Sequence, residues 1–375
     1  MIRRVFLHIG LPKTGTTYLQ SIAWSHQEQL LEHGLLLPGF GPRQHLWASG
    51  VVRGEPRLER RHPNAPHAWS HLLSEVAKWP ATTLISHEFF CGADRKQAAA
   101  ALTDLNRAGA DEVHLVVTCR ELVELVTARW QEWIKNGATG SIDSYPPSAE
   151  FRPEDEWGWG TLDLAEVLDR WAAGLHPKRV HVMCPPGGSS RPEALWRTFA
   201  GIIGVADVRV DTTLAQANPG LGVVQVETLR RINPHLTTFR RPVDRGVWIR
   251  RYLAEGVLAR LGGEPFWPNL ERVAELRERS KIGLERVASS GYDVHGSLDR
   301  LRTPDHLPPR RHPTSVTDAE VAEVAVSLVA RLLEDVRDRT PSDAGRGGSS
   351  YPGADSRIRG LVRRVQARAS RASGR

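Results

Sequence analysis

Apolar residues in the N-terminal half of the chain follow two alternating patterns. Short, nearly continuous apolar runs occupy residues 3–9, 82–86, 112–118 and 179–183. Between these runs, apolar residues recur at helical spacing over residues 14–33, 71–78, 94–106, 121–135 and 162–173. Continuous apolar runs are typical of strands buried on both faces, and their alternation with helices favours parallel pairing through right-handed crossovers. The pattern therefore predicts an α/β protein with a central parallel sheet flanked by helices.

Two stretches interrupt this alternation, residues 34–70 and 138–160. Both are rich in Gly and Pro and show no clear period, so we expect loop excursions over the surface. The C-terminal half is mainly helical in pattern. There, Thr317 and Glu320 form a capping box that predicts a long amphipathic helix ending near Asp338.

These patterns suggest one main domain over residues 1–339. We expect an α/β core at about 1–210 and a helical extension at about 211–339. Residues 340–375 are rich in Gly, Ser and Arg and poor in apolar groups, so their composition predicts disorder. A short basic helix over 357–371 is compatible with the pattern.

The charge of the chain is concentrated in this tail. The net charge is +7, and residues 340–375 contain eight arginines and two aspartates, which leaves the body near neutrality. The basic net charge therefore reports the tail and does not argue for a nucleic-acid-binding body. For the tail, a solvated segment is the favoured interpretation and contact with anionic surfaces is the alternative.

Cysteine usage and hydropathy indicate a cytoplasmic protein. The three cysteines have no paired spacing, which suits a reducing compartment and offers no metal-binding or disulfide framework. The N-terminus has no signal-peptide layout, and no apolar run approaches the roughly 20 residues of a membrane span.

The most informative stretch is Gly10 to Thr17, which lies between the first strand and the first helix. Such a junction directs backbone N–H groups and the positive end of the helix dipole at one point, where an anion can bind. Only two residues separate Gly10 from Lys13, whereas an NTPase P-loop has four residues between its glycines and the lysine after the second. The third strand is followed by Arg120, a cation suited to a second phosphate, rather than by the Asp that an NTPase uses for Mg²⁺.

These motifs resemble those of sulfotransferases that use 3′-phosphoadenylyl sulfate (PAPS). GLPKTGTT at residues 10–17 resembles their 5′-phosphosulfate loop, and VVTCR at 116–120 resembles their 3′-phosphate strand and helix. Further similarity to bacterial members lies at residues 85–88, 130–132, 168–174 and 291–301. The resemblance covers roughly residues 1–305 and implies a P-loop-NTPase-like sulfotransferase fold, with PAPS as the donor and no metal.

The resemblance also implies roles for individual residues. Lys13 would contact the bridging oxygen and the sulfuryl group, and would stabilise the charge that develops on the leaving phosphate. Donors to the 5′-phosphate would come from Thr14, Gly15, Thr16 and Thr17. Arg120 would bind the 3′-phosphate. The alternative for Lys13 is a solvated loop lysine beside threonines that cap a helix.

One position departs from the family pattern. The family has a serine eight residues after the arginine, where this chain has Ala128. Thr127 and Arg129 are the candidates to replace that contact with the 3′-phosphate, and for both a plain helix-surface role is the alternative.

The acceptor loses a proton as it attacks sulfur, so a general base is needed near the sulfuryl group. His87 and Glu88 follow the second strand, where parallel sheets place their sites, and we favour Glu88. The implied function is transfer of a sulfuryl group to a hydroxyl or amine of a small molecule or glycan, with a carbohydrate or glycolipid suggested by analogy. The alternatives are an ATP-dependent kinase and a non-catalytic nucleotide-binding protein.

Other notable residues are assigned to packing or solvent. His8 lies within an apolar run and is interpreted as a hydrogen-bonded core residue, and Trp130 and Trp133 as packing residues. His45 and His67 are expected to be solvated loop histidines.

Overall fold

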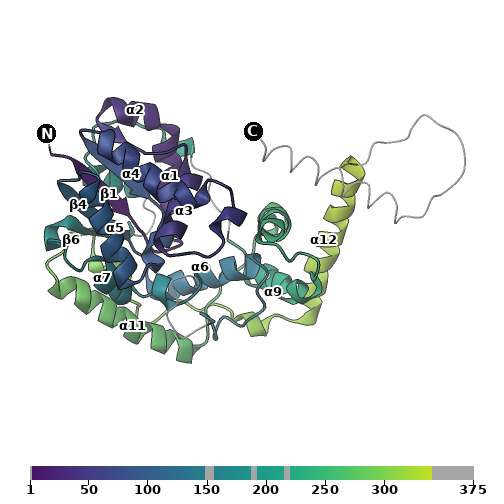
Figure 1. The fold of residues 1–375 in the computed structure, drawn as a ribbon. Helices are drawn as coiled ribbons and strands as arrows, with labels where there is room; N and C mark the ends of the chain where they lie inside the picture. Colours follow the sequence, from purple (N-terminus) through teal and green to yellow (C-terminus); the bar gives the residue numbers. More distant parts are fainter. Residues whose placement is uncertain (1, 148–155, 187–191, 215–219, 340–375) are drawn as a thin grey trace, which may run out of the picture. The chain divides into compact units, whose positions relative to one another are not determined.

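The computed structural model describes residues 2–147, 156–186, 192–214 and 220–339. The chain divides into two compact units, one ending at Thr317 and one beginning at Asp318. The first unit contains the sheet (Figure 1). All the predicted site residues belong to this unit. The described part of the second unit is helix α12 (Asp318–Arg339), close to the predicted bounds.

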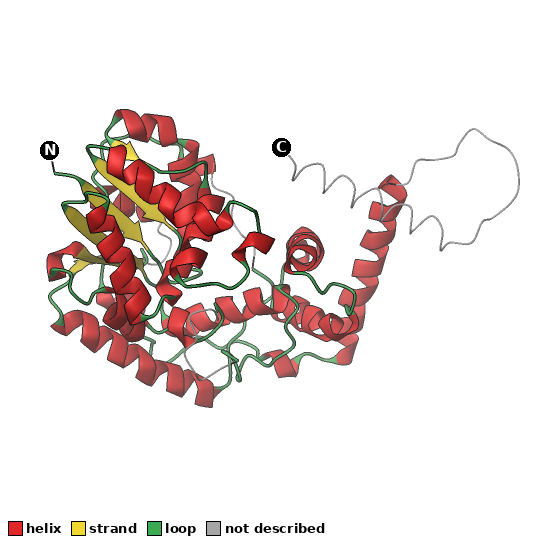
Figure 2. Cartoon of the chain, in the orientation of Figure 1, coloured by secondary structure: helices red, strands yellow, loops and turns green. Residues whose placement is uncertain are grey.

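A sheet of parallel strands forms the centre of the first unit (Figure 2). Among the described residues it has six strands, in the order β2-β3-β1-β4-β5-β6. In chain order the strands are β1 (Arg4–His8), β2 (Leu35–Leu36), β3 (Thr82–Ser86), β4 (Glu112–Thr118), β5 (Val180–Met183) and β6 (Asp293–His295). The predicted α/β class and parallel sheet are confirmed. The edge strands β2 and β6 were not predicted, because runs of two or three residues show no readable period.

Helices cover both faces of the sheet. They include α1 (Thr16–Ser25), α2 (Gln27–Glu32), α4 (Ala68–Lys78), α5 (Arg95–Arg107), α6 (Leu122–Lys135), α7 (Leu164–Trp171), α8 (Pro192–Ile202) and α11 (Leu270–Ser289). On one face, Phe6 of β1 shares a buried cluster with Leu19 of α1 and Phe199 of α8. On the other face, Leu7 and Leu115 are fully buried, and α5 contacts β4 and α7. The single helix predicted over 14–33 is divided into α1 and α2.

The prediction of a surface excursion over residues 34–70 is wrong. This stretch adds β2 to the sheet edge and then forms α3 (Pro42–Val52). Pro42 is at the start of α3, where a missing N–H costs nothing. Trp47 is almost fully buried. Small and polar residues occupy many of the buried positions of α3, which hid its helical period.

The second irregular stretch is also packed where it is described. Residues 148–155 lie outside the described residues, but Tyr145 before them is fully buried and η4 (Trp159–Thr161) after them is buried. Trp130 of α6 is fully buried against Phe266, as the packing interpretation predicted.

The region after residue 211 is mainly helical but returns to the sheet. It contains α9 (Val223–Ile232), the π-helix η8 (Arg245–Val257) and α11, which is followed by β6. The predicted basic tail, 340–375, lies outside the described residues. None of the helices that the structure describes has the length and apolar character to cross a membrane.

Candidate functional site

The loop between β1 and α1 has an unusual backbone that brings it close to β4. Lys13 has φ 67°, and Gly15 has φ 97°. A left-handed conformation is costly for a lysine, and such strain is typical of functional loops. At Gly10, an added Cβ would lie 2.3 Å from Thr118 Oγ1, so glycine permits the close approach of the loop to the end of β4.

The threonines of the loop have different surroundings. The hydroxyl of Thr14 donates to the Leu11 carbonyl oxygen at 2.5 Å and lies 2.7 Å from Thr118 Oγ1, so it stabilises the loop itself. Thr16 Oγ1 is buried and has no hydrogen-bond partner among the described residues. Gly15, the N-cap of α1, provides no side-chain cap, so the first N–H groups of α1 also lack a capping acceptor. The start of α1 therefore offers both hydroxyl and backbone donors to an anion.

The ammonium of Lys13 is held by a buried carboxylate. Its Nζ lies 2.8 Å from Glu132 Oε2 on α6, and Arg250 Nε of η8 lies 2.7 Å from the other oxygen, Oε1. Burial alone would raise the pKa of Glu132, but the charges of Lys13 and Arg250 outweigh it and lower that pKa to about 2. Glu132 is therefore ionised and holds two cations next to the loop.

Arg120 follows β4 and connects the loop to α6. Its Nη1 donates to the Lys13 carbonyl oxygen at 3.4 Å, and its Nε donates to Glu124 at 3.0 Å. The two cationic residues that the sequence singled out are thus neighbours, although 107 positions separate them.

Arg120 also lines a cavity of about 360 Å³. Thr127 and Ala128 form part of the α6 wall, and Gly222, Trp267 and Arg310 lie among the other lining residues. The guanidinium of Arg310 stacks on Trp267, with its carbon 3.8 Å from the ring centroid. The cavity thus combines a partly exposed arginine with an aromatic wall.

The two proposed substitutes for the missing serine differ in position. Thr127 lines the cavity, although its hydroxyl proton is donated to the Val123 carbonyl oxygen at 2.7 Å. Arg129 is buried, donates to the Glu156 carbonyl and stacks on Trp157 at 4.3 Å. Arg129 therefore serves packing on the other side of α6.

His87 and Glu88 follow β3, beside the end of β1, and the backbone N–H of His87 donates to the His8 carbonyl oxygen at 3.0 Å. Nδ1 of His87 accepts the N–H of Phe89 at 3.1 Å, and burial lowers the pKa of His87. The neutral ring must then carry its proton on Nε2, which leaves no lone pair there to accept another. Glu88 Oε2, in contrast, is buried and has no hydrogen-bond partner in the described chain, so Glu88 is the better proton acceptor.

Two buried histidines contact Ser86, the last residue of β3, next to His87 and Glu88. Nδ1 of His8 lies 2.8 Å from Ser86 Oγ, as its core interpretation implied. His45, expected in solvent, is instead fully buried: its Nδ1 accepts the Ser86 N–H at 3.1 Å and its Nε2 donates to Pro38 O at 2.8 Å. The expectation for His45 is wrong because α3 packs onto β3. His67 is exposed, as expected.

The ion pairs of Glu132 with Lys13 and Arg250 were not predicted from the sequence. Glu132 belongs to a stretch noted only for its family resemblance, and Arg250 lies more than a hundred residues further along the chain, with no motif around it. Both act through a tertiary contact that no local spacing reveals.

No protein-family model and no curated protein matches this chain.

Proposed function

We propose that this protein is a PAPS-dependent sulfotransferase that transfers a sulfuryl group to a hydroxyl or amine of an acceptor. The observation that supports this most strongly is the contact of Arg120 with the Lys13 carbonyl. Lys13 lies just before the N-terminus of α1, and Arg120 follows the neighbouring strand β4. This arrangement suits a nucleotide with phosphates on the 3′ and 5′ positions of its ribose.

In the proposed complex, the 5′-phosphosulfate lies at the start of α1. The N–H groups of the first turn and the Thr16 hydroxyl donate to the phosphate. The ammonium of Lys13 contacts the bridging oxygen of the donor while Glu132 remains close to it. Arg120 binds the 3′-phosphate, and the cavity beside it receives the nucleoside, with Trp267 as the aromatic wall.

The reaction is an in-line displacement. The acceptor oxygen or nitrogen forms a bond to sulfur as the bond from sulfur to the bridging oxygen breaks, and 3′-phosphoadenosine 5′-phosphate (PAP) leaves. Lys13 stabilises the negative charge on the leaving phosphate. The acceptor proton passes to Glu88, whose buried oxygen has no hydrogen-bond donor among the described residues.

The acceptor is proposed only by class, as a small molecule or glycan that carries a hydroxyl or amine. The charges of Arg53 and Arg61 act on His87, and both arginines are paired with Glu55, at 3.3 and 2.6 Å respectively, so this side of the site is polar. Polar surroundings suit a sugar better than a purely apolar acceptor.

The test is conversion of PAPS to PAP by the purified chain in the presence of pooled hydroxyl and amine acceptors. We expect PAP to accumulate with the parent protein and not with Lys13→Met. Tight PAP binding without turnover for any acceptor class would support the non-catalytic alternative. Phosphate transfer from ATP with Mg²⁺ would support the kinase alternative.

A further inference from the structure

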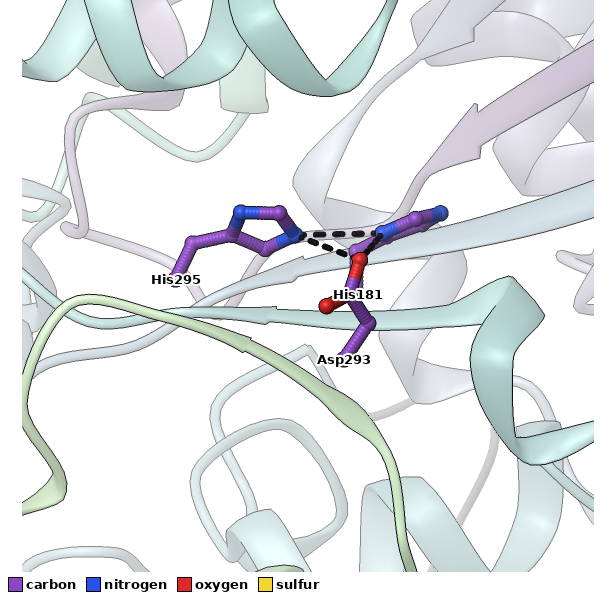
Figure 3. Close-up of side chains that lie close together, drawn as sticks. All are labelled: His181, Asp293 and His295. Atoms are coloured by element: carbon purple, nitrogen blue, oxygen red, sulfur yellow. Dashed lines mark hydrogen bonds and ion pairs between the residues drawn. The ribbon is translucent and has the colours of Figure 1, made fainter.

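A second group of polar side chains lies on β5 and β6, at the opposite sheet edge from β2. His181 of β5 lies beside Asp293 and His295 of β6 (Figure 3). In the sheet register, His181 pairs with Asp293 and Met183 pairs with His295. Because side chains alternate between faces along a strand, all three polar groups project from the same face.

The three potential ligand atoms converge on one point. His181 Nδ1 and His295 Nε2 each lie 3.0 Å from Asp293 Oδ2, and the two nitrogens lie 3.2 Å apart. Tetrahedral zinc, with bonds of about 2.0–2.2 Å, separates its ligand atoms by about 3.3 Å. Side-chain movements of a few tenths of an ångström would therefore create the geometry of a metal site.

A chain of contacts extends from His181 toward β4. His181 Nε2 lies 2.9 Å from His114 Nδ1, and His114 Nε2 lies 3.4 Å from Glu112 Oε2. Glu112 is in turn fixed by Arg4 and Arg179, at 2.9 and 3.1 Å. Metal-bound histidines commonly donate their other ring N–H toward such a carboxylate, which fixes the tautomer.

His114 and His181 alone cannot supply a proton to every contact in this series. Two imidazoles, His114 and His181, lie between two carboxylates, Glu112 and Asp293, so three contacts need a hydrogen or a cation. Two neutral rings supply only two protons. If His114 donates to Glu112 and His181 donates to His114, the bare Nδ1 of His181 faces the Asp293 carboxylate at 3.0 Å. If both tautomers are reversed, the bare Nε2 of His114 faces the Glu112 carboxylate at 3.4 Å instead.

The contact between His181 Nδ1 and Asp293 Oδ2 is satisfied either by the Nε2–H of a neutral His295 or by a metal ion between the three ligand atoms. Nε2 of His295 points at the same place as the other two ligand atoms, so a metal ion there would have three protein ligands. The side chains of Asp293 and His295 are 40% and 26% exposed, so a fourth, water-filled position is accessible. Two imidazoles and one carboxylate suit zinc and similar borderline ions better than Mg²⁺ or Ca²⁺.

We propose that His181 Nδ1, Asp293 Oδ2 and His295 Nε2 bind a divalent transition-metal ion of the zinc class. The ion holds the three-residue strand β6 against β5, where few backbone hydrogen bonds are available. His114 contacts the other ring nitrogen of His181 and is itself held by Glu112, so these two residues orient the His181 ring. This structural site is independent of the proposed sulfuryl transfer.

The experiment uses the full chain without an affinity tag, stripped of metal with a chelator. We expect Co²⁺ to bind in one equivalent with the visible absorption of a tetrahedral site, Zn²⁺ to displace it, and Zn²⁺ to raise the melting temperature. Asp293→Asn and His295→Gln should each weaken Co²⁺ binding by about tenfold or more. The control His306→Gln, at an exposed histidine, should bind as the parent does.

The proposal is overturned if the parent fails to bind one equivalent of Co²⁺, or if both ligand variants bind it like His306→Gln. Asp293→Asn preserves size and hydrogen bonding, so it remains a test if His295→Gln does not fold. PAP binding provides the independent readout, because the ligand variants should retain it whenever they are folded.

Discussion

The ammonium of Lys13 and the carboxylate of Glu132 form an ion pair with a separation of 2.8 Å. Lys13 lies on the loop before α1 and has a left-handed backbone conformation. The Glu132 side chain is only 7% exposed and is also paired with Arg250. Glu132 thus positions the lysine that the proposed chemistry requires.

The first prediction concerns the stability of this cluster. Glu132→Gln leaves two cations without their shared carboxylate, and we expect the free energy of unfolding to fall by about 2 kcal/mol. Urea unfolding measures this loss. Glu278→Gln removes a carboxylate that is 67% exposed and paired with Lys281, and should change stability by less than about 0.5 kcal/mol. Equal effects of the two variants would refute the structural role of Glu132.

The second prediction separates catalysis by Lys13 from donor binding. Lys13→Met should lower kcat by about 100- to 1,000-fold, because the lysine stabilises charge that develops only as the sulfur–oxygen bond breaks. PAP affinity should fall by less than about tenfold, since the N–H groups of α1 remain. Parallel losses in kcat and in PAP affinity would mean that Lys13 only binds the nucleotide.

The third prediction assigns the 3′-phosphate to Arg120. Arg120→Ala should weaken PAP binding by about 30-fold, which corresponds to about 2 kcal/mol, and leave adenosine 5′-phosphate binding nearly unchanged. Arg197→Ala, at an exposed arginine of α8, is the matched control. If PAP and adenosine 5′-phosphate lose affinity equally in Arg120→Ala, Arg120 does not bind the 3′-phosphate.

The fourth prediction distinguishes the two candidate bases. Glu88→Gln should lower kcat by about 100-fold or more while PAP still binds. In His87→Gln, the amide oxygen can still accept the Phe89 N–H, so turnover should be largely retained. The reverse order of effects would transfer the base role to His87.

The fifth prediction is a loss of stability on mild acidification. Burial lowers the pKa of His8 to about 3 and that of His45 to about 4, whereas both titrate near 6.5 when unfolded. Between pH 6.5 and about 4 the unfolded chain therefore binds more protons, and the free energy of unfolding should fall as the pH decreases through this window. Below about pH 4.5, protonation of Glu132 in the unfolded chain should lower stability further toward pH 2.

Urea unfolding at several pH values between 7.5 and 4.5 measures this slope. His45→Gln removes one of the two buried imidazoles and should flatten the pH dependence. His67→Gln, at an exposed histidine, should retain the full slope. A slope that is the same in all three proteins would contradict this origin.

The sequence predicted those parts of the fold that local patterns encode. The apolar runs of β1, β3 and β4 predicted the parallel sheet, and the pattern around Lys13 predicted a loop between a strand and a helix, which β1 and α1 confirm. It missed β2, β6 and α3, because two strands are too short for a period and the buried residues of α3 are largely polar or small. Their placement depends on tertiary packing.

In the candidate site, too, local patterns predicted some residues, and others were brought in by tertiary packing. Lys13, Glu88 and Arg120 follow strands or begin helices, so their positions could be predicted from local signals. Glu132, Arg250 and His45 reach the site from distant segments. The histidine cluster on β5 and β6 joins residues 112 positions apart, which no ligand spacing in the sequence could indicate.

The most direct test of the proposed use of PAPS is a calorimetric titration of the full chain with PAP and, separately, with ATP and Mg²⁺. The two-cation arrangement of Lys13 and Arg120 predicts that PAP binds about 100-fold more tightly than ATP, because only PAP satisfies both positions. Tight binding of ATP, with no advantage for the nucleotide that carries a 3′-phosphate, would contradict the proposal that this protein uses PAPS.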